Sequence, residues 1–136
     1  MSVTIAAINV HTKKQGLGMS KQSDFVRENS KLLDSSKCAR LGDLRFGSNE
    51  RFHHALAKFL LAWEFKQSGM VFSTEAVFDG GKGRCDVFNL SDGVAYEVLD
   101  SELEENIKVK EGKYPVLVKS FKAKEVIKLW LKRISE

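Results

Sequence analysis

The chain has 136 residues, of which 43% are hydrophobic and 29% are charged. These values predict one soluble globular domain, and no apolar run approaches the ~20 residues of a membrane-spanning helix. Lysine and arginine exceed aspartate and glutamate by 22 to 18, which gives a net charge of +4 and a pI near 9.1. This mild basic excess is compatible with a polyanionic partner but does not identify one.

Cys38 and Cys85 are the two cysteines, and their spacing predicts neither a disulfide framework nor a zinc site. Residues 1–10 contain an apolar run, but no basic segment precedes it and no cleavage site follows it, so we expect no secretory signal. The expected protein is therefore reduced, cytoplasmic and without a membrane partner.

Residues 1–47 are less clearly patterned than the rest of the chain. A strand is expected at 2–10, a loop at 11–20, a short helix at 23–33 and a glycine-containing link at 40–47. We interpret this part as an N-terminal extension that serves as an arm, a cap or an oligomerisation element.

Residues 48–136 carry stronger signals and are predicted to form the core domain. Ser48 or Asn49 can cap a helix that has Glu50 in its first turn, and Gly69 ends that helix. Its apolar side chains share one helical stripe and are expected to face the core. They are Phe52, Leu56, Phe59, Leu60 and Trp63.

Three strands follow this helix. The first is expected at 70–78 and the second at 84–90, with a glycine-rich turn at 79–83 between them. The third is expected at 94–99, after a hairpin turn around 92–93.

A charged helix is then expected at 101–111, a fourth strand at 116–119 and a last helix at 123–134. The last helix is expected to place its apolar side chains inward, namely Val126, Ile127, Trp130, Leu131 and Ile134. The order αβββαβα predicts an α/β or α+β fold in which helices cover a mixed sheet.

Three acids lie in or beside the predicted strands: Glu75, Asp86 and Glu97. A strand interior is unfavourable for a carboxylate unless a partner offsets its desolvation. One such acid is ordinarily a solvent-facing residue, but three on consecutive strands suggest a shared site.

The expected hairpin turn provides a test of this suggestion. A two-residue turn at 92–93 sets Asp86 opposite Leu99 and Phe88 opposite Glu97. Asp86 and Glu97 then share a face as diagonal neighbours about 7–8 Å apart. From that separation both carboxylates can converge on one Mg²⁺ or Mn²⁺ ion.

Residues 48–134 resemble the core of the PD-(D/E)XK, or restriction-endonuclease-like, nuclease superfamily. The resemblance rests on the amphipathic helix, Glu75, the stretch 83–87, the Asp-Gly hairpin and the stretch 95–98. It implies that Asp86 and Glu97 bind the divalent metal and that Glu75 assists them. Glu50 matches a helix glutamate of the family less well, because the helical wheel places it opposite the core stripe.

One position departs from the family pattern, because Leu99 stands where the family has a catalytic lysine. The expected substitutes for its positive charge are Lys108, Lys110 and Arg84. Without a substitute, the chain is expected to bind DNA without cutting it.

The resemblance implies a Mg²⁺- or Mn²⁺-dependent DNA endonuclease, and it makes a homodimer plausible. The residues expected to contact DNA are basic and lie in the glycine-rich turn and on the last helix: Lys82, Arg84, Lys124, Lys128 and Lys132. Two alternatives remain open: a non-catalytic nucleic-acid-binding module, and a protein-interaction domain whose acids are surface residues.

Other chemical signals are weak. His53 and His54 lack the spacing of a helical zinc site and are interpreted as exposed or half-buried helix residues. Cys85 alternates to the strand face opposite Asp86 and is expected in the core.

Overall fold

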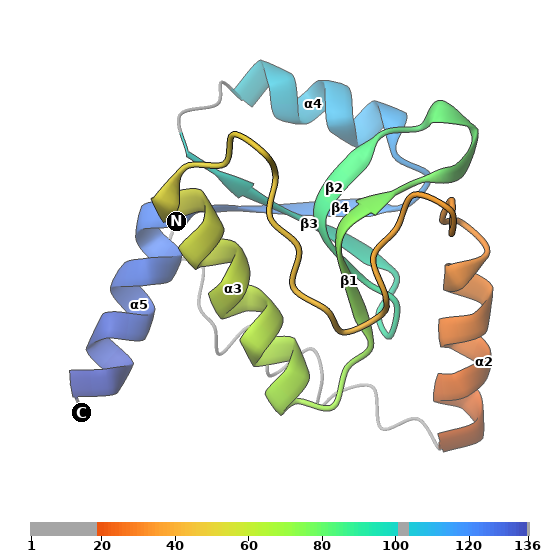
Figure 1. The fold of residues 1–136 in the computed structure, drawn as a ribbon, viewed down its shortest axis with the longest axis horizontal. Helices are drawn as coiled ribbons and strands as arrows, with labels where there is room; N and C mark the ends of the chain where they lie inside the picture. Colours follow the sequence, from red (N-terminus) through yellow and green to blue (C-terminus); the bar gives the residue numbers. More distant parts are fainter. Residues whose placement is uncertain (1–18, 101–103, 136) are drawn as a thin grey trace.

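The structure is a computed structural model that describes residues 19–100 and 104–135. The strand expected at 2–10 and most of the loop expected at 11–20 lie outside these residues. Four described helices, α2 (Met19–Ser30), α3 (Phe52–Gln67), α4 (Glu104–Lys113) and α5 (Ala123–Ser135), surround one sheet (Figure 1). The fold is mixed α+β, and its element order from α3 onward is the predicted αβββαβα.

The sheet has four strands in the order β1-β2-β3-β4. The strands β1 (Phe72–Val77), β2 (Arg84–Asn89) and β3 (Val94–Leu99) are consecutive antiparallel neighbours. The chain then crosses through α4, and β4 (Leu117–Lys122) pairs parallel with β3. A mixed sheet follows from this connection, because only a long crossover brings the chain back in a parallel direction.

Two apolar clusters fill the space around the sheet. The first joins α3 and α5 to the sheet, and the rings of Phe65 and Tyr96 lie 4.9 Å apart within it. The second includes Phe78, Phe88 and Cys85. Cys85 is buried, which confirms the prediction that it lies in the core. Val26, Leu32 and Leu33, which come from α2 and the segment after it, pack against this second cluster.

The segment between α2 and α3 is also attached by backbone hydrogen bonds. Asp79 N donates to Leu32 O at 2.9 Å, and Asp34 N donates to Val77 O at 2.9 Å. The side-chain amide of Asn29 donates to Leu90 O at 2.7 Å. These bonds fix the described part of residues 19–47 against β1 and the β2–β3 turn.

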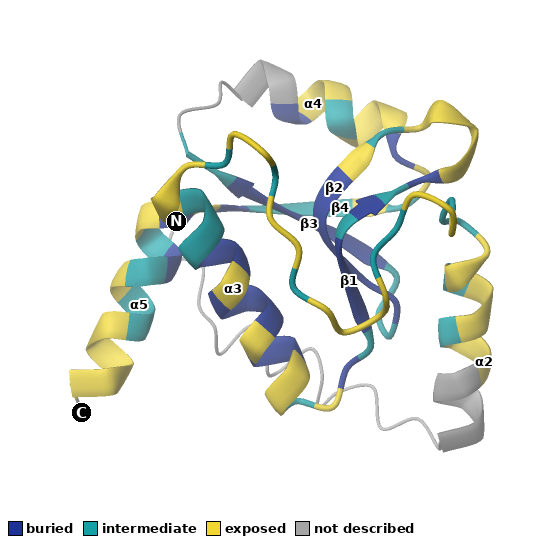
Figure 2. Cartoon of the chain, in the orientation of Figure 1, coloured by how far each residue is buried: buried dark blue, intermediate teal, exposed yellow. Residues whose placement is uncertain are grey.

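The predicted inward face of α3 is confirmed for Leu60, which is buried, and for Leu56, which packs against the first cluster, but it is wrong for the aromatic residues. Phe52 is 73% exposed, and Phe59 and Trp63 are each 40% exposed, whereas Lys58 and Glu64 are buried. Buried and exposed positions alternate along α3 (Figure 2). The helix also begins at Phe52 after Arg51, without a side-chain cap from Ser48 or Asn49. The buried face is rotated away from the aromatic side chains, because small and apolar residues fill the first cluster together with Leu60: Ala57, Leu61, Ala62 and Phe65.

The last helix is partly as predicted. Val126 is buried, and Ile127 and Trp130 pack against the first cluster. Leu131 and Ile134 are 60% and 72% exposed, so their predicted burial is wrong. The reason is that the last turns of α5 run past the sheet and are not covered by it (Figure 1).

Candidate functional site

The β2–β3 hairpin places two of the predicted acids directly opposite each other. Val87 pairs with Tyr96, and the next position along this register sets Asp86 against Glu97. The prediction that Asp86 lies opposite Leu99 is therefore wrong by two positions. A shift of two keeps both side chains on the same face of the sheet, so the two carboxyls are closer than expected.

The turn chemistry explains the different register. The side-chain oxygen of Asn89 accepts hydrogen bonds from Ser91 N at 2.9 Å and from Asp92 N at 3.1 Å. Gly93 N donates to Asn89 O at 2.8 Å, and Gly93 has a φ of +74°. Asn89 thus organises a four-residue connection in place of the two-residue turn, because an asparagine side chain can accept from the backbone two residues on.

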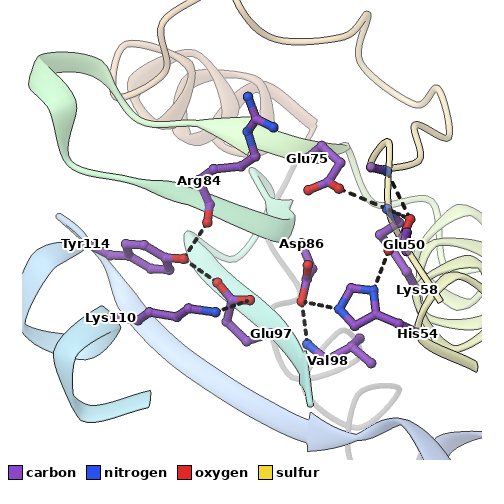
Figure 3. A network of polar contacts seen from close by, with 11 residues as sticks. Glu50, His54, Lys58, Glu75, Arg84, Asp86, Glu97, Val98, Lys110 and Tyr114 are labelled. Atoms are coloured by element: carbon purple, nitrogen blue, oxygen red, sulfur yellow. Dashed lines mark hydrogen bonds and ion pairs between the residues drawn. The ribbon is translucent and has the colours of Figure 1, made fainter. Parts of the chain in front are cut away.

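Glu75 lies at the same level on the neighbouring strand. Thr74 pairs with Val87 and Ala76 with Cys85, and these pairs bracket Glu75 and Asp86. Glu75 has a φ of +50°, a left-handed conformation that costs a residue with a Cβ roughly 1–3 kcal/mol. The three predicted acids therefore form a row across β1, β2 and β3 (Figure 3).

Helix α3 and the segment before it complete one end of this acid row with Glu50, His54 and Lys58. His54 Nε2 lies 3.2 Å from Asp86 Oδ2, and His54 Nδ1 is in close contact with Glu50 Oε2. Lys58 Nζ donates to Glu50 Oε1 at 2.8 Å and to Glu75 Oε1 at 3.4 Å. The Lys58 side chain has no exposed surface, so it is committed to these carboxylates.

Sequence reasoning underestimated Glu50 and did not identify Lys58. Glu50 was placed opposite the core, yet its side chain is 6% exposed and holds two cations. The missed signal is the spacing, because polar residues at 50, 54 and 58 repeat at i, i+4 and i+8 and so share one helical face. His54 is half-buried, within the range that the sequence allowed.

Residues from α4 and its C-terminal end lie at the other end of the acid row. The Tyr114 hydroxyl contacts Glu97 Oε1 and lies 2.5 Å from Arg84 O. Lys110 Nζ lies 3.6 Å from Glu97 Oε2. Of the expected substitutes for the family lysine, Lys110 reaches the acids, Lys108 is exposed, and the guanidinium of Arg84 points away from Glu97 (Figure 3).

The acids and His54 have altered affinities for protons. Burial, together with the neighbouring Asp86, raises the pKa of Glu97 to about 8. Burial also opposes the charge of Asp86, but hydrogen bonds from His54 and Glu97 outweigh it and leave the pKa of Asp86 below its usual value. The hydrogen bond to Asp86 is the main reason that the pKa of His54 rises to about 9, and burial raises the pKa of Glu75.

At neutral pH the row therefore combines a protonated Glu97, an ionised Asp86 and a charged His54. The oxygen-rich donor set has the chemistry of Mg²⁺ and Mn²⁺ sites. As arranged, however, no three His, Cys, Asp or Glu among residues 19–100 and 104–135 are placed to hold a metal ion. Lys58 and His54 instead balance the charge of the carboxylates.

A pocket of about 330 Å³ opens beside the row. It is lined by Gly47, Asn49, Glu50, Arg51, His54, Glu75 and Asp100. Gly47 N donates to Glu50 Oε1 at 3.1 Å, and a Cβ at Gly47 would lie 3.1 Å from Glu75 Oε1. The small size of Gly47 thus lets the backbone approach both carboxylates.

The residues predicted to contact DNA are all exposed. Lys82 and Arg84 lie at the β1–β2 turn. Lys124, Lys128 and Lys132 are spaced by four along one face of α5. The DNA-binding prediction stays a prediction.

Comparison with family models, with curated proteins and with solved structures gives no significant match to this chain. Within the described part of the chain, none of the helices has both the length and the apolar character needed to cross a membrane.

Proposed function

We propose that the protein is a metal-dependent nuclease with a restriction-endonuclease-like core, which hydrolyses phosphodiester bonds of DNA. The observation that supports this most directly is the acid row, in which Glu75, Asp86 and Glu97 occupy adjacent strands at one level. The order αβββαβα and the parallel pairing of β3 with β4 agree with the proposal.

Asp86 and Glu97 are the proposed holders of Mg²⁺ or Mn²⁺, with Glu75 beside them. When bound, the ion would lower the pKa of a water molecule and neutralise charge on the phosphate. Glu97 must give up its proton to serve as a ligand, and the Tyr114 hydroxyl and Lys110 are placed to stabilise the resulting carboxylate. His54 holds Asp86 in position through its hydrogen bond.

Lys58 is the proposed source of the positive charge that Leu99 cannot supply. Its ammonium group is fixed beside Glu75 by burial and by two carboxylates, whereas Lys110 is 31% exposed and lies farther from its acid. Because the ammonium group has no exposed surface, it would act on the phosphate through its electric field, across the acids that it contacts, and not by direct contact.

Cleavage assays of nicked, branched, single-stranded and duplex DNA with Mn²⁺ test the proposal. Asp86→Asn and Glu97→Gln should each abolish cleavage while leaving DNA binding intact, because each removes a metal-binding charge. Glu111→Gln, which alters an exposed acid of α4, is the matched control. If the wild type cleaves no DNA form with any divalent metal ion, the proposal of nuclease activity is overturned.

A pair of variants tests the role of Lys58. Lys58→Met should lower the cleavage rate by about 100-fold or more, which corresponds to about 2.7 kcal/mol of transition-state stabilisation. Leu99→Lys should change the rate little if Lys58 already supplies the charge. A large gain from Leu99→Lys would show that Lys58 does not fill this role.

A non-catalytic DNA-binding module on the same fold is the second candidate. The observation that favours it is the charge balance, because Lys58 and His54 neutralise the carboxylates without a metal. This candidate predicts DNA binding that neither EDTA nor Mn²⁺ changes and no cleavage of any DNA form.

A further inference from the structure

A second pocket lies on the α4 side of the acid row. Its volume is about 320 Å³, and its lining consists of Gly83, Arg84, Val109, Lys110, Lys113 and Tyr114. Three of these six residues are cations, and none is an acid. This composition contrasts with the first pocket, whose lining contains the acids Glu50, Glu75 and Asp100 together with Arg51 and His54.

Close packing between the β1–β2 turn and the end of α4 builds this cationic pocket. Gly83 has a φ of +109°, and a Cβ there would lie 2.7 Å from Tyr114 Cε1 and 3.8 Å from Lys113 Cδ. Phe78 N donates to Gly83 O at 2.8 Å, and the Tyr114 hydroxyl lies 2.5 Å from Arg84 O. These contacts hold elements from distant parts of the chain together, so the cations meet at a defined place.

The pocket is connected to the acid row by two of its own residues. Tyr114 contacts Glu97 through its hydroxyl, and Lys110 Nζ lies 3.6 Å from Glu97 Oε2 (Figure 3). An anion in the cationic pocket would therefore lie next to the carboxylate that is proposed to hold the metal.

We infer that the cationic pocket binds a phosphate group of a nucleic-acid strand, adjacent to the phosphodiester at the acid row. This inference rests on the proposed function and adds a substrate subsite to it. Arginine and lysine side chains are the usual protein partners of phosphate oxygens. The lining contains no acid, and the neighbouring carboxyl group of Glu97 is held by Lys110 and Tyr114. The pocket binds the strand without a metal, and so positions it across Glu97.

The subsite is tested by titrating the full chain with a hexathymidylate oligonucleotide in the presence of EDTA. Binding is monitored by the chemical shifts of the backbone amides in NMR spectra. The shifts should include the amides of Gly83, Lys113 and Tyr114. Arg84→Gln with Lys113→Gln should weaken binding at least tenfold. The slope of log K against log salt should become shallower by about 0.7, which is the change expected when one phosphate of a single strand is no longer neutralised.

Lys66→Gln is the matched control, because Lys66 is an exposed lysine near the C-terminal end of α3. This variant should bind the oligonucleotide with the same affinity as the wild type. The subsite would be overturned if the double variant bound the oligonucleotide as tightly as the wild type does. It would also be overturned if the amide NMR shifts were confined to α5. A parallel titration with inorganic phosphate separates the two sources of phosphate. Equal affinity for inorganic phosphate and the oligonucleotide would overturn its assignment to nucleic acid.

The outcome is independent of catalysis because EDTA removes the metal. If the wild type cleaves no DNA with Mn²⁺ but shows the expected NMR shifts, the nuclease proposal is rejected and the phosphate subsite is retained. Cleavage that is unaffected by the double variant, together with unchanged binding, would reject the subsite and retain the nuclease.

Discussion

The ammonium group of Lys58 lies 3.4 Å from Glu75 Oε1, and the lysine side chain is fully buried. Glu75 adopts a left-handed backbone conformation at this point of β1. Burial of a charge is costly unless it is paired, so the two residues depend on each other for their ionised states. Glu50 extends the pair, because its carboxylate also contacts Lys58.

Removal of Lys58 should therefore destabilise the fold in a pH-dependent way. We expect Lys58→Met to lower the free energy of unfolding by about 3 kcal/mol at pH 8, because Glu75 is left as an unpaired buried charge and Glu50 keeps only His54 as a cationic partner. The loss should shrink at pH 5, since burial already raises the pKa of Glu75 and protonation removes the unpaired charge. Urea denaturation at both pH values measures the effect. Lys66→Met on the same helix is the control, and equal losses at the two pH values would contradict the electrostatic explanation.

The stability of the metal-free protein should fall as the pH rises from about 6.5 to 9. The pKa of His54 rises from 6.5 to about 9 on folding, so the stabilisation by its proton is complete below pH 6.5 and is lost as the pH approaches 9. After allowance for solvent screening at this half-buried ring, we expect about 1–2 kcal/mol. Urea denaturation in EDTA across this range measures it.

Two variants separate the contributions to this pH dependence. His54→Gln should make the curve shallower from pH 6.5 upward and nearly flat between pH 8 and 9. Glu97→Gln should make it shallower between pH 4.5 and 8, because the pKa of Glu97 rises from 4.5 to about 8 and its stabilising proton is lost over that interval. A curve between pH 8 and 9 that is equally steep in the wild type and in His54→Gln would contradict the His54 contact with Asp86.

Metal binding should release protons. Glu97 is protonated at pH 7 because its pKa is about 8, and a carboxylate must be ionised to coordinate a metal. We expect the Mn²⁺ affinity to fall by about tenfold per pH unit below pH 8 and about one proton to be released at pH 7. Calorimetric titrations in buffers of different ionisation enthalpy count the protons. Tight binding without pH dependence would place the metal away from Glu97.

Gly83 and Gly81 form a matched pair of substitutions. Both have a positive φ, of +109° and +71°, but a Cβ at Gly81 meets no atom within 4 Å, whereas one at Gly83 would collide with Tyr114. Gly81→Ala should cost about 1 kcal/mol for the backbone alone. Gly83→Ala should cost at least ~1 kcal/mol more, because the turn must move off the tyrosine ring. Thermal denaturation compares them, and equal losses would contradict the close packing at Tyr114.

The sequence predicted the strands and the acid row better than it predicted their surroundings. Glycine-rich and Asp-Gly segments separate the strands clearly, and alternation combined with an even number of residues in the connection puts Asp86 and Glu97 on one face. The register was missed because the side chain of Asn89 organises the turn, which residue preferences at Asp92 and Gly93 do not reveal.

The helix that faces the acids was harder to orient. Its large aromatic residues, Phe59 and Trp63, stack on each other at 6.2 Å on the partly exposed side, so hydrophobicity predicted a face that is rotated from the buried one. The buried side carries Lys58, whose burial depends on carboxylates that come from elsewhere in the chain. A helical pattern read by itself cannot show such partners.

The meander of β1, β2 and β3 has a consequence for the order of folding. The three acids come from strands that follow one another through short connections, so the row can assemble through contacts between near neighbours in the chain. The parallel pairing of β4 with β3 must wait for a longer loop to close, which slows that step. We expect the acid row to be assembled early, while closure of the sheet by β4 and packing of α5 limit the rate at which the folded protein is completed.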